Sequence, residues 1–149
     1  MSFATYEKLD VACEQLEVAL RLFFEGKEYF AVITLAGAAE ELLGAYVKAK
    51  GGTTSLEELV KGAVRISSAL SGAPSKPKDI FKIANYPRNA SKHMDDATDA
   101  QLRIYLKRDA TDLLDRAVDN YYRLMEHHDL PETALVGQFN RYRVSGDAS

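Results

Sequence analysis

The chain has 149 residues but a single cysteine, Cys13, and no tryptophan. One cysteine excludes an internal disulfide and a zinc site built from several cysteines, and it suits a reducing compartment. Cys13 stands among leucines at helical spacing, which predicts a buried and unreactive thiol. Because no basic segment followed by an apolar one opens the sequence, we expect no secretory signal and a cytoplasmic protein.

Long uninterrupted apolar runs and an excess of positive charge are also lacking. Residues 30–47 form the most apolar stretch, but Glu40 and Glu41 interrupt it, so we expect a buried helix and no membrane association. The 19 Lys and Arg against 22 Asp and Glu give a net charge of −3. A protein that coats nucleic acid nonspecifically is strongly basic, so the net charge argues against this class, although a local basic patch is still allowed. No glycine-rich phosphate loop or nucleophile elbow occurs.

Strand-like alternation is absent, and apolar residues recur every three or four positions along the whole chain. Capping boxes at Ser55 and Thr98 are expected to open two helices. A further helix is expected to start at Pro87. The pattern predicts other helices over residues 5–25, 27–50, 55–70, 79–84, 98–127 and 131–142. The tail, residues 145–149, is expected to be disordered.

These helices are expected to form one domain, because residues 1–149 contain no repeat and no linker. Its core is predicted over about residues 5–128. The stretch 27–50 is apolar nearly all round, as a central helix is. The predicted fold class is therefore all-α, an up-and-down helical bundle of about five to six helices. A helix this apolar needs cover on every side, so we also expect a homodimer.

Residues 85–93 read Asn-Tyr-Pro-Arg-Asn-Ala-Ser-Lys-His and carry the most informative pattern. A residue before proline avoids the α conformation, and proline favours the first helical position, so we expect a helix to start at Pro87. Arg88 and Asn89 would then lie in its first turn, where free backbone N–H groups and an arginine fork favour a phosphate. Residues five apart on a helix point about 140° apart. Arg88 and His93 are therefore expected to converge only beyond the helix end or across an interface with a second copy.

The motif lies in a basic segment. Five basic residues between positions 76 and 93 stand against one acid, Asp79, for a local charge of five minus one, +4: Lys76, Lys78, Lys82, Arg88 and Lys92. A solvated charged face is the plain alternative to a binding site here. The further candidates for binding around Arg88 are Lys82, Ser91, Lys92, Glu40 and Glu41. The two glutamates are expected to pair with basic groups, one of them supporting Arg88.

A metal site is the competing interpretation of the acidic residues. Carboxylates together with His93 are hard ligands, and helical bundles with paired Glu-x-x-His motifs bind two iron ions. The second Glu-x-x-His that such a site needs is absent from this sequence. We therefore predict no metal ligands and no cofactor.

The pattern Arg-Asn-x-x-x-His, in a small all-helical chain, resembles the Arg-x4–6-His motif of the HEPN superfamily. Residues 34–43, Thr-Leu-Ala-Gly-Ala-Ala-Glu-Glu-Leu-Leu, also resemble the buried second helix of small bacterial HEPN-like proteins. The resemblance implies a HEPN-like fold and metal-independent RNA cleavage. In that chemistry His93 moves a proton of the 2′-hydroxyl or the leaving oxygen, Arg88 neutralises charge on the phosphate, and Asn89 holds the substrate.

The same resemblance implies two motifs that meet at a dimer interface, and a toxic or defensive role with a separate antitoxin-like partner protein. Three functions stay open from the sequence: a ribonuclease of this type, a HEPN-like module that binds RNA, a nucleotide or a protein without cleaving, and a plain scaffold. The acidic overall charge favours the second over the first slightly. Neither Arg88→Ala nor His93→Ala is expected to unfold the protein, because both residues are expected at a helix end or interface.

Overall fold

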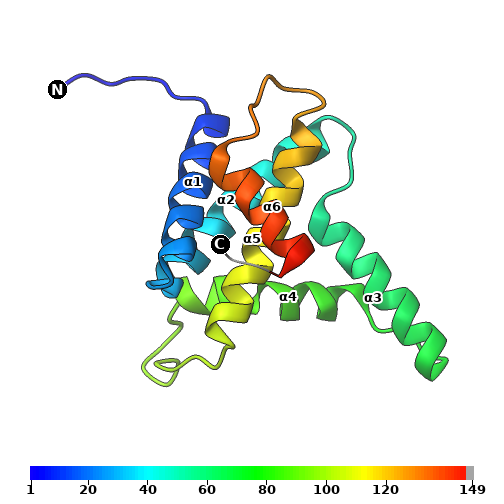
Figure 1. Cartoon of the computed structure of the whole chain (residues 1–149). Coiled ribbons are helices and arrows are strands. Elements are labelled where there is room, and N and C mark those ends of the chain that lie inside the picture. The colour runs from blue at the N-terminus through cyan, green and yellow to red at the C-terminus, as the bar shows by residue number, and fades with distance from the viewer. Residues whose placement is uncertain (147–149) are drawn as a thin grey trace.

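The computed structural model describes residues 1–146, and these residues contain helices and no strand (Figure 1). The predicted all-α fold class is confirmed. The six helices in this part of the chain are α1 (Lys8–Glu25), α2 (Tyr29–Ala49), α3 (Ser55–Ser71), α4 (Pro77–Lys92), α5 (Leu106–Leu124) and α6 (Ala134–Ser145).

The apolar core lies between α1, α2, α5 and α6. Its largest fully buried side chains come from all four helices and include Leu16, Leu20, Ile33, Leu43, Leu113, Leu114 and Phe139. Phe23 of α1 meets Phe139 of α6 edge to face, with ring centroids 5.7 Å apart, which fixes α6 against α1. Neighbours from the same chain therefore bury the central helix α2, and its apolar composition by itself gives no reason to require a second copy.

The apolar composition of α2 also has a membrane interpretation. By length and composition, α2 could cross a membrane. Half of its most apolar window is buried against the rest of the protein. The central helix of a bundle has this same composition, so the packing of α2 accounts for it without a bilayer.

Several helix ends differ from those predicted, because nearby side chains cap them elsewhere. Thr54, one residue before the predicted box, caps α3 by accepting a hydrogen bond from the Glu57 N–H at 3.1 Å. The predicted helix start at Thr98 is wrong. Its backbone N–H and hydroxyl both donate to the Asp96 carboxylate, and this local turn competes with helix formation. The helix α5 starts at Leu106 instead, and ends at Leu124.

The C-terminal helix is also displaced from its predicted bounds. Thr133 caps it by accepting from the Val136 N–H at 3.2 Å, so it starts after the predicted position at Pro131. It continues to Ser145, and Gly146 ends it in the left-handed conformation. Of the tail expected to be disordered, residues 145 and 146 thus belong to the end of α6, and the others lie outside the described residues.

The helix α3 projects from one side of the bundle, and α4 runs back across the lower end of the bundle in this view (Figure 1). We refer to the two helices together, residues 55–92, as the arm. Two residues of α3 are buried, Leu56 and Val60, and none of α4. The arm therefore takes little part in the apolar core. The motif predicted from the sequence lies in this arm, at the end of α4 that meets α2.

Candidate functional site

The motif lies near the C-terminal end of α4 and not at a helix start. The helix runs unbroken through Pro87, so the predicted break before this proline is wrong. A proline inside a helix removes the hydrogen bond to the carbonyl four residues earlier, which belongs to Ile83. Ile83 is exposed, so water can serve as a hydrogen-bond donor to its carbonyl in place of the missing N–H. Arg88 and Asn89 lie beyond the first turns, and the free N–H groups of a helix start do not contribute to the site.

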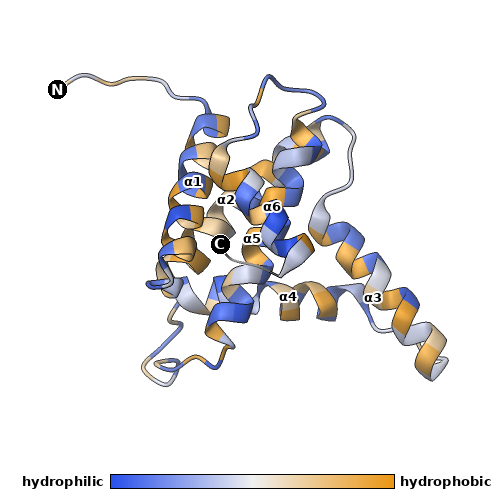
Figure 2. Cartoon of the chain, in the orientation of Figure 1, coloured by the Kyte–Doolittle hydropathy of each residue, from blue (hydrophilic) through white to orange (hydrophobic). Residues whose placement is uncertain are grey.

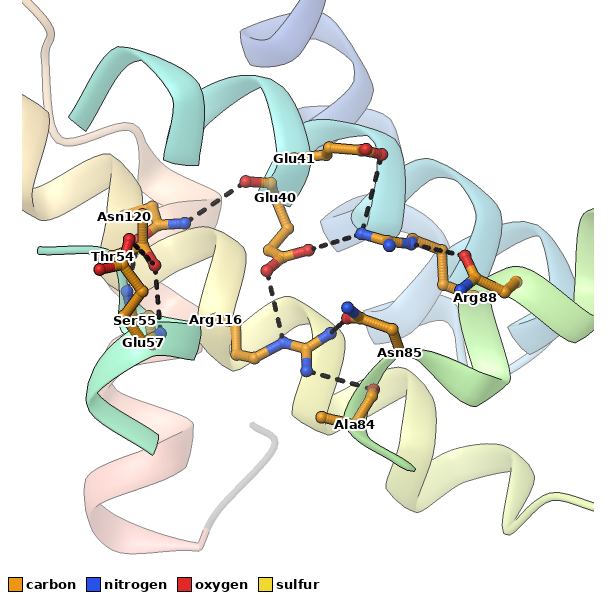
Figure 3. Close-up of polar contacts among 11 residues, drawn as sticks. Glu40, Glu41, Thr54, Ser55, Glu57, Ala84, Asn85, Arg88, Arg116 and Asn120 are labelled. Atoms are coloured by element: carbon orange, nitrogen blue, oxygen red, sulfur yellow. Dashed lines mark hydrogen bonds and ion pairs between the residues drawn. The ribbon is translucent and has the colours of Figure 1, made fainter. Parts of the chain in front are cut away.

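Glu40 of α2 lies between two arginines at the centre of the site (Figure 3). The Glu40 side chain is buried; its Oε2 lies 3.3 Å from Nη1 of Arg88 and its Oε1 lies 3.6 Å from Nε of Arg116. Glu41, which is exposed, lies 3.7 Å from the same Nη1 of Arg88. Burial raises the pKa of Glu40, while the charges of Arg116 and Arg88 act in the opposite direction. Arg88 is thus paired with both glutamates, and more closely with the buried one.

Arg116 of α5 connects this ion pair to α4. It donates from Nη1 to the carbonyl of Ala84 at 3.2 Å and from Nη2 to Oδ1 of Asn85 at 3.4 Å. Burial lowers the pKa of Arg116, and the carboxylate of Glu40 opposes that shift. Because an arginine stays charged in proteins, Glu40 has a buried permanent cation on one side and Arg88 on the other.

Asn120, one turn after Arg116 on α5, completes the polar contacts. It is fully buried, donates to the backbone carbonyl of Glu40 at 3.4 Å, and accepts from the Ser55 N–H at 2.9 Å. These contacts join α2, α3, α4 and α5. We refer to the residues that make them as the Glu40 cluster: Glu40, Glu41, Asn85, Arg88, Arg116 and Asn120.

Gly37 makes room for Arg88 on the surface of α2. A methyl group at this glycine would lie 2.6 Å from Cγ of Arg88 and 2.7 Å from its Cδ. The aliphatic part of the arginine therefore rests directly on the backbone of α2. Glycine at position 37 and arginine at position 88 thus form a matched pair that fixes the direction of the guanidinium.

One edge of the Arg88 guanidinium stays available. Its Nε donates to Oδ1 of Asn89 at 3.3 Å and its Nη1 meets the glutamates, while no hydrogen bond joins Nη2 to the described residues. The arginine lines an open groove of about 410 Å³, together with Glu41, Lys48 and Phe81 among others. A partly engaged guanidinium of this kind retains donors for an anion that enters from solvent.

His93 follows α4 as its C-terminal cap, with an extended backbone. It is exposed, and its ring makes no hydrogen bond to another residue in the described part of the chain. It lines a separate hollow of about 300 Å³ with Ser91 and Gln101, whereas Arg88 lines the groove on the α2 side. Within one chain the structure does not bring Arg88 and His93 together.

The other predicted binding residues lie around this end of α4. Lys82 and Lys92 are exposed and form no ion pair with the described residues. Ser91 is turned inward, since its hydroxyl donates to the carbonyl of Pro87. Asn89 is exposed; its oxygen is engaged by Arg88 and its amide nitrogen makes no hydrogen bond within residues 1–146.

Arg116, Asn120, Asn85 and Gly37 were not among the residues predicted to form the site. The signal for two of them is present in the sequence: Arg116 and Asn120 stand one turn apart within the apolar stripe of α5, next to Ala117 and Tyr121. A charged residue and an amide on the buried face of a helix indicate a polar network, because burial without partners is costly. Asn85 and Gly37 carry no comparable signal, since their roles depend on the crossing of α4 over α2.

Neither a group of metal ligands nor a known relative indicates what this site does. Among the residues that the structure describes, no three His, Cys, Asp or Glu side chains come close enough to hold a metal ion. Comparisons of the chain with protein-family models, with curated proteins and with solved structures found no match. The function is therefore inferred from the residues of the site.

Proposed function

We propose that the protein is a HEPN-type ribonuclease whose active site combines Arg88 of one copy with His93 of a second. The observation that supports this proposal most directly is the state of these two side chains. Arg88 is held in one orientation by Glu40 and Gly37, and its Nη2 forms no hydrogen bond with the described residues. His93 is exposed, and its ring forms no hydrogen bond within residues 1–146. The Arg88 side chain is only 12% exposed, but it lines an open groove, and His93 lines a separate hollow, so a molecule from outside the chain can reach each of them.

The proposed reaction is attack of a ribose 2′-hydroxyl on the neighbouring phosphorus, with loss of the 5′-oxygen of the next nucleotide. It yields a 2′,3′-cyclic phosphate and a 5′-hydroxyl. His93 takes the proton of the 2′-hydroxyl or gives one to the leaving oxygen, and Arg88 neutralises the charge that builds on the phosphate. The free amide of Asn89 holds the phosphate or sugar, and Lys82 and Lys92 contact flanking phosphates.

Glu40 has a positioning role in this proposal. It keeps the Arg88 fork in a fixed direction by pairing with Nη1, so that an incoming phosphate meets Nη2 and competes with Glu41 for Nη1. Glu41 is the natural residue to be displaced because its side chain is 62% exposed and its oxygen is the more distant one at 3.7 Å. An antitoxin-like protein that covered this face would block the site.

The direct test is cleavage of a short RNA in the presence of EDTA. Cleavage is expected to persist there and to leave 2′,3′-cyclic phosphate ends, while DNA, which has no 2′-hydroxyl, is spared. His93→Ala is expected to lower the rate by roughly 10²–10⁴-fold, and Arg88→Lys, which keeps the charge but not the fork, by at least about 10²-fold. His127→Ala and Arg103→Ala are the matched controls, since both residues are exposed and lie outside α4.

Arg88→Lys is chosen because Arg88 belongs to a buried cluster. Arg88 was expected at a helix end or interface, where Arg88→Ala would not unfold the protein. Its burial against Glu40 does not fit that position, and Arg88→Ala would lower stability because it leaves Glu40 with one partner fewer. His93, being exposed, is expected to be replaced without loss of stability. A parent protein that cuts RNA no faster than the Arg88→Lys, His93→Ala double variant would refute the proposal.

The second candidate function is a module that binds RNA without cleaving it. The observation that favours it is the pairing of Arg88 with two carboxylates, together with its separation from His93 in the chain. The parent protein would then shift the fluorescence anisotropy of labelled RNA without cutting it. Binding would weaken as salt rises, and Lys92→Ala would weaken it across all sequences.

A further inference from the structure

The arm carries an apolar stripe that the described part of the chain leaves largely exposed. Leu59, Ile66 and Leu70 of α3 are 47%, 62% and 83% exposed. Residues at this spacing point within about 40° of one another on a helix. The buried apolar residues of α3, Leu56 and Val60, lie about 60° and 100° round the helix from Leu59. The helix α3 thus has one wide apolar face, of which the bundle covers the part near the start of the helix; apolar segments recur along α3 in Figure 2.

The exposed face is also free of charge. By helical geometry, every charged residue of α3 lies about 100° or more from the centre of the stripe. These residues are Glu57, Glu58, Lys61 and Arg65. The positions that flank the stripe are small, among them Gly62 and Ala63. A neutral face of large apolar residues flanked by small ones can meet an identical face without repulsion between like charges.

Gly62 lies in the middle of α3, and the protein's own packing does not explain it. A glycine inside a helix costs about 1 kcal/mol relative to alanine. A methyl group at Gly62 would have no atom within 4 Å, so no neighbour in the chain requires its absence. At a crossing with a second helix, the missing side chain would let the two backbones approach closely.

The base of the same arm offers a receiving surface. A hollow of about 440 Å³ lies where α3 and α4 meet α5. Leu59, Ile80, Ile83 and Pro87 line its apolar side, and charged residues of α5 and α6, among them Asp112 and Arg143, line the other side. Ile83 is 74% exposed. Leu70, near the tip of the arm, lies about 16 Å along α3 from Leu59. An apolar tip and a hollow with an apolar side therefore lie at opposite ends of one helix.

We propose that two copies of the chain pair through their α3 helices, antiparallel, about a twofold axis near Gly62 and Ala63. In this arrangement Leu59 of one copy faces Ile66 of the other. Leu70 reaches the neighbourhood of Ser55 in the second copy, at the rim of its hollow, and the same contact is made twice because the interface is symmetric. This pairing rests on the stripe, the hollow and Gly62, and it stands even if the protein cuts no RNA. The contact between Arg88 of one copy and His93 of a second is a separate proposal, and the pairing through α3 does not depend on it.

The oligomeric state tests the pairing. Light scattering after size exclusion, at tens of micromolar, is expected to give a dimer for the parent. An Ile66→Glu, Leu70→Glu variant is expected to be monomeric, with a dimer Kd raised by about 100-fold or more, because it places charges in the apolar contact. A Lys61→Glu, Arg65→Glu variant alters as many positions on the opposite side of α3 and should stay dimeric. A monomeric parent, or a dimeric Ile66→Glu, Leu70→Glu variant, would overturn the proposal.

Cross-linking tests the position of the axis. In a Cys13→Ser background, Ala63→Cys is expected to form a disulfide-linked dimer on mild oxidation, because the two Ala63 positions lie close together at the axis. Ser68→Cys is the control, since Ser68 is exposed on the opposite side of α3. Far-ultraviolet circular dichroism verifies that each variant is folded. Efficient linkage at position 68 with none at position 63 would contradict this antiparallel arrangement.

Discussion

The body of the molecule and the α3–α4 arm are held in place by different interactions. The body, formed by α1, α2, α5 and α6, has a continuous apolar core, whereas α4 buries no residue and α3 buries two. Polar contacts attach the arm. Ser55 donates to Asn120 at the base of α3, Arg116 donates to the carbonyl of Ala84, and Arg88 pairs with Glu40.

Because of this difference, one set of interactions stabilises the domain and another sets the orientation of α4. Apolar burial is non-directional and contributes most of the stability of a domain. Hydrogen bonds and buried ion pairs contribute about 1 kcal/mol or less each in net terms, but they require a defined geometry. The Glu40 cluster therefore sets the position of α4, and with it the direction of Arg88, while the body supplies the rigid surface. Disturbing the cluster should free the arm before it affects the body.

Removing the charge of Glu40 is expected to have the largest effect. Glu40→Gln leaves Arg88 and Arg116 with an uncompensated buried charge, and breaking such a pair costs about 3–5 kcal/mol. Denaturant unfolding measures this loss. Amide hydrogen exchange should locate it, with faster exchange over α4 than over α2 or α5.

Glu41→Gln is the matched control for Glu40→Gln. The two residues are adjacent and both lie near Nη1 of Arg88, but Glu41 is exposed, so its loss is expected to cost less than about 1 kcal/mol. Equal losses for the two variants would show that the buried position of Glu40 does not matter, and the distinction between body and arm would fail.

Replacing one large apolar residue by alanine in the body and one in the arm tests the same comparison through apolar burial. Leu114 in the body is fully buried, and Leu114→Ala is expected to cost about 2–5 kcal/mol. Ile66→Ala in the arm removes an exposed side chain, and alanine is favoured in helices. The free energy of unfolding of the monomer should therefore change by no more than about 0.5 kcal/mol. Urea unfolding measures the free energy of unfolding of both variants. A low protein concentration keeps the chain monomeric in this measurement. A large loss at Ile66 under those conditions would mean that the arm is packed within its own chain.

The sequence predicted the body better than the arm, for physical reasons. Periodic apolar residues are enough to predict α1 and α2 to within a few residues, because core burial determines those helices. Pro87 was expected to begin a helix, since local preference favours that position. It lies inside α4 instead, where the contacts of Arg88 and Ala84 with α2 and α5 outweigh that preference.

The Glu40 cluster was predictable in part. An ion pair from Glu40 or Glu41 to Arg88 was expected, and the structure contains it. The partners from α5 were not, because Arg116 and Asn120 reach the cluster through tertiary packing, and local sequence does not encode how α5 crosses α2 and α4. The spacing of Arg88 and His93 did predict that they point apart on one helix, and in the structure they line separate hollows.

Gly37 offers the most specific test of how the arm is attached. In Gly37→Ala the new methyl group must displace the stem of Arg88, which lies 2.6 Å from its position, so the Arg88–Glu40 contact should weaken. Alanine also favours the helix by about 1 kcal/mol, which offsets part of the lost contact. We therefore expect a net change of no more than about 1 kcal/mol in the free energy of unfolding, together with faster hydrogen exchange around Arg88.

Gly44→Ala is the control on the same helix, because its methyl group would meet Asn120 at an ordinary 3.4 Å. It should leave exchange in α4 unchanged. If both variants behaved alike, Gly37 would not position Arg88, and the polar cluster would hold the arm without the close contact between α2 and α4.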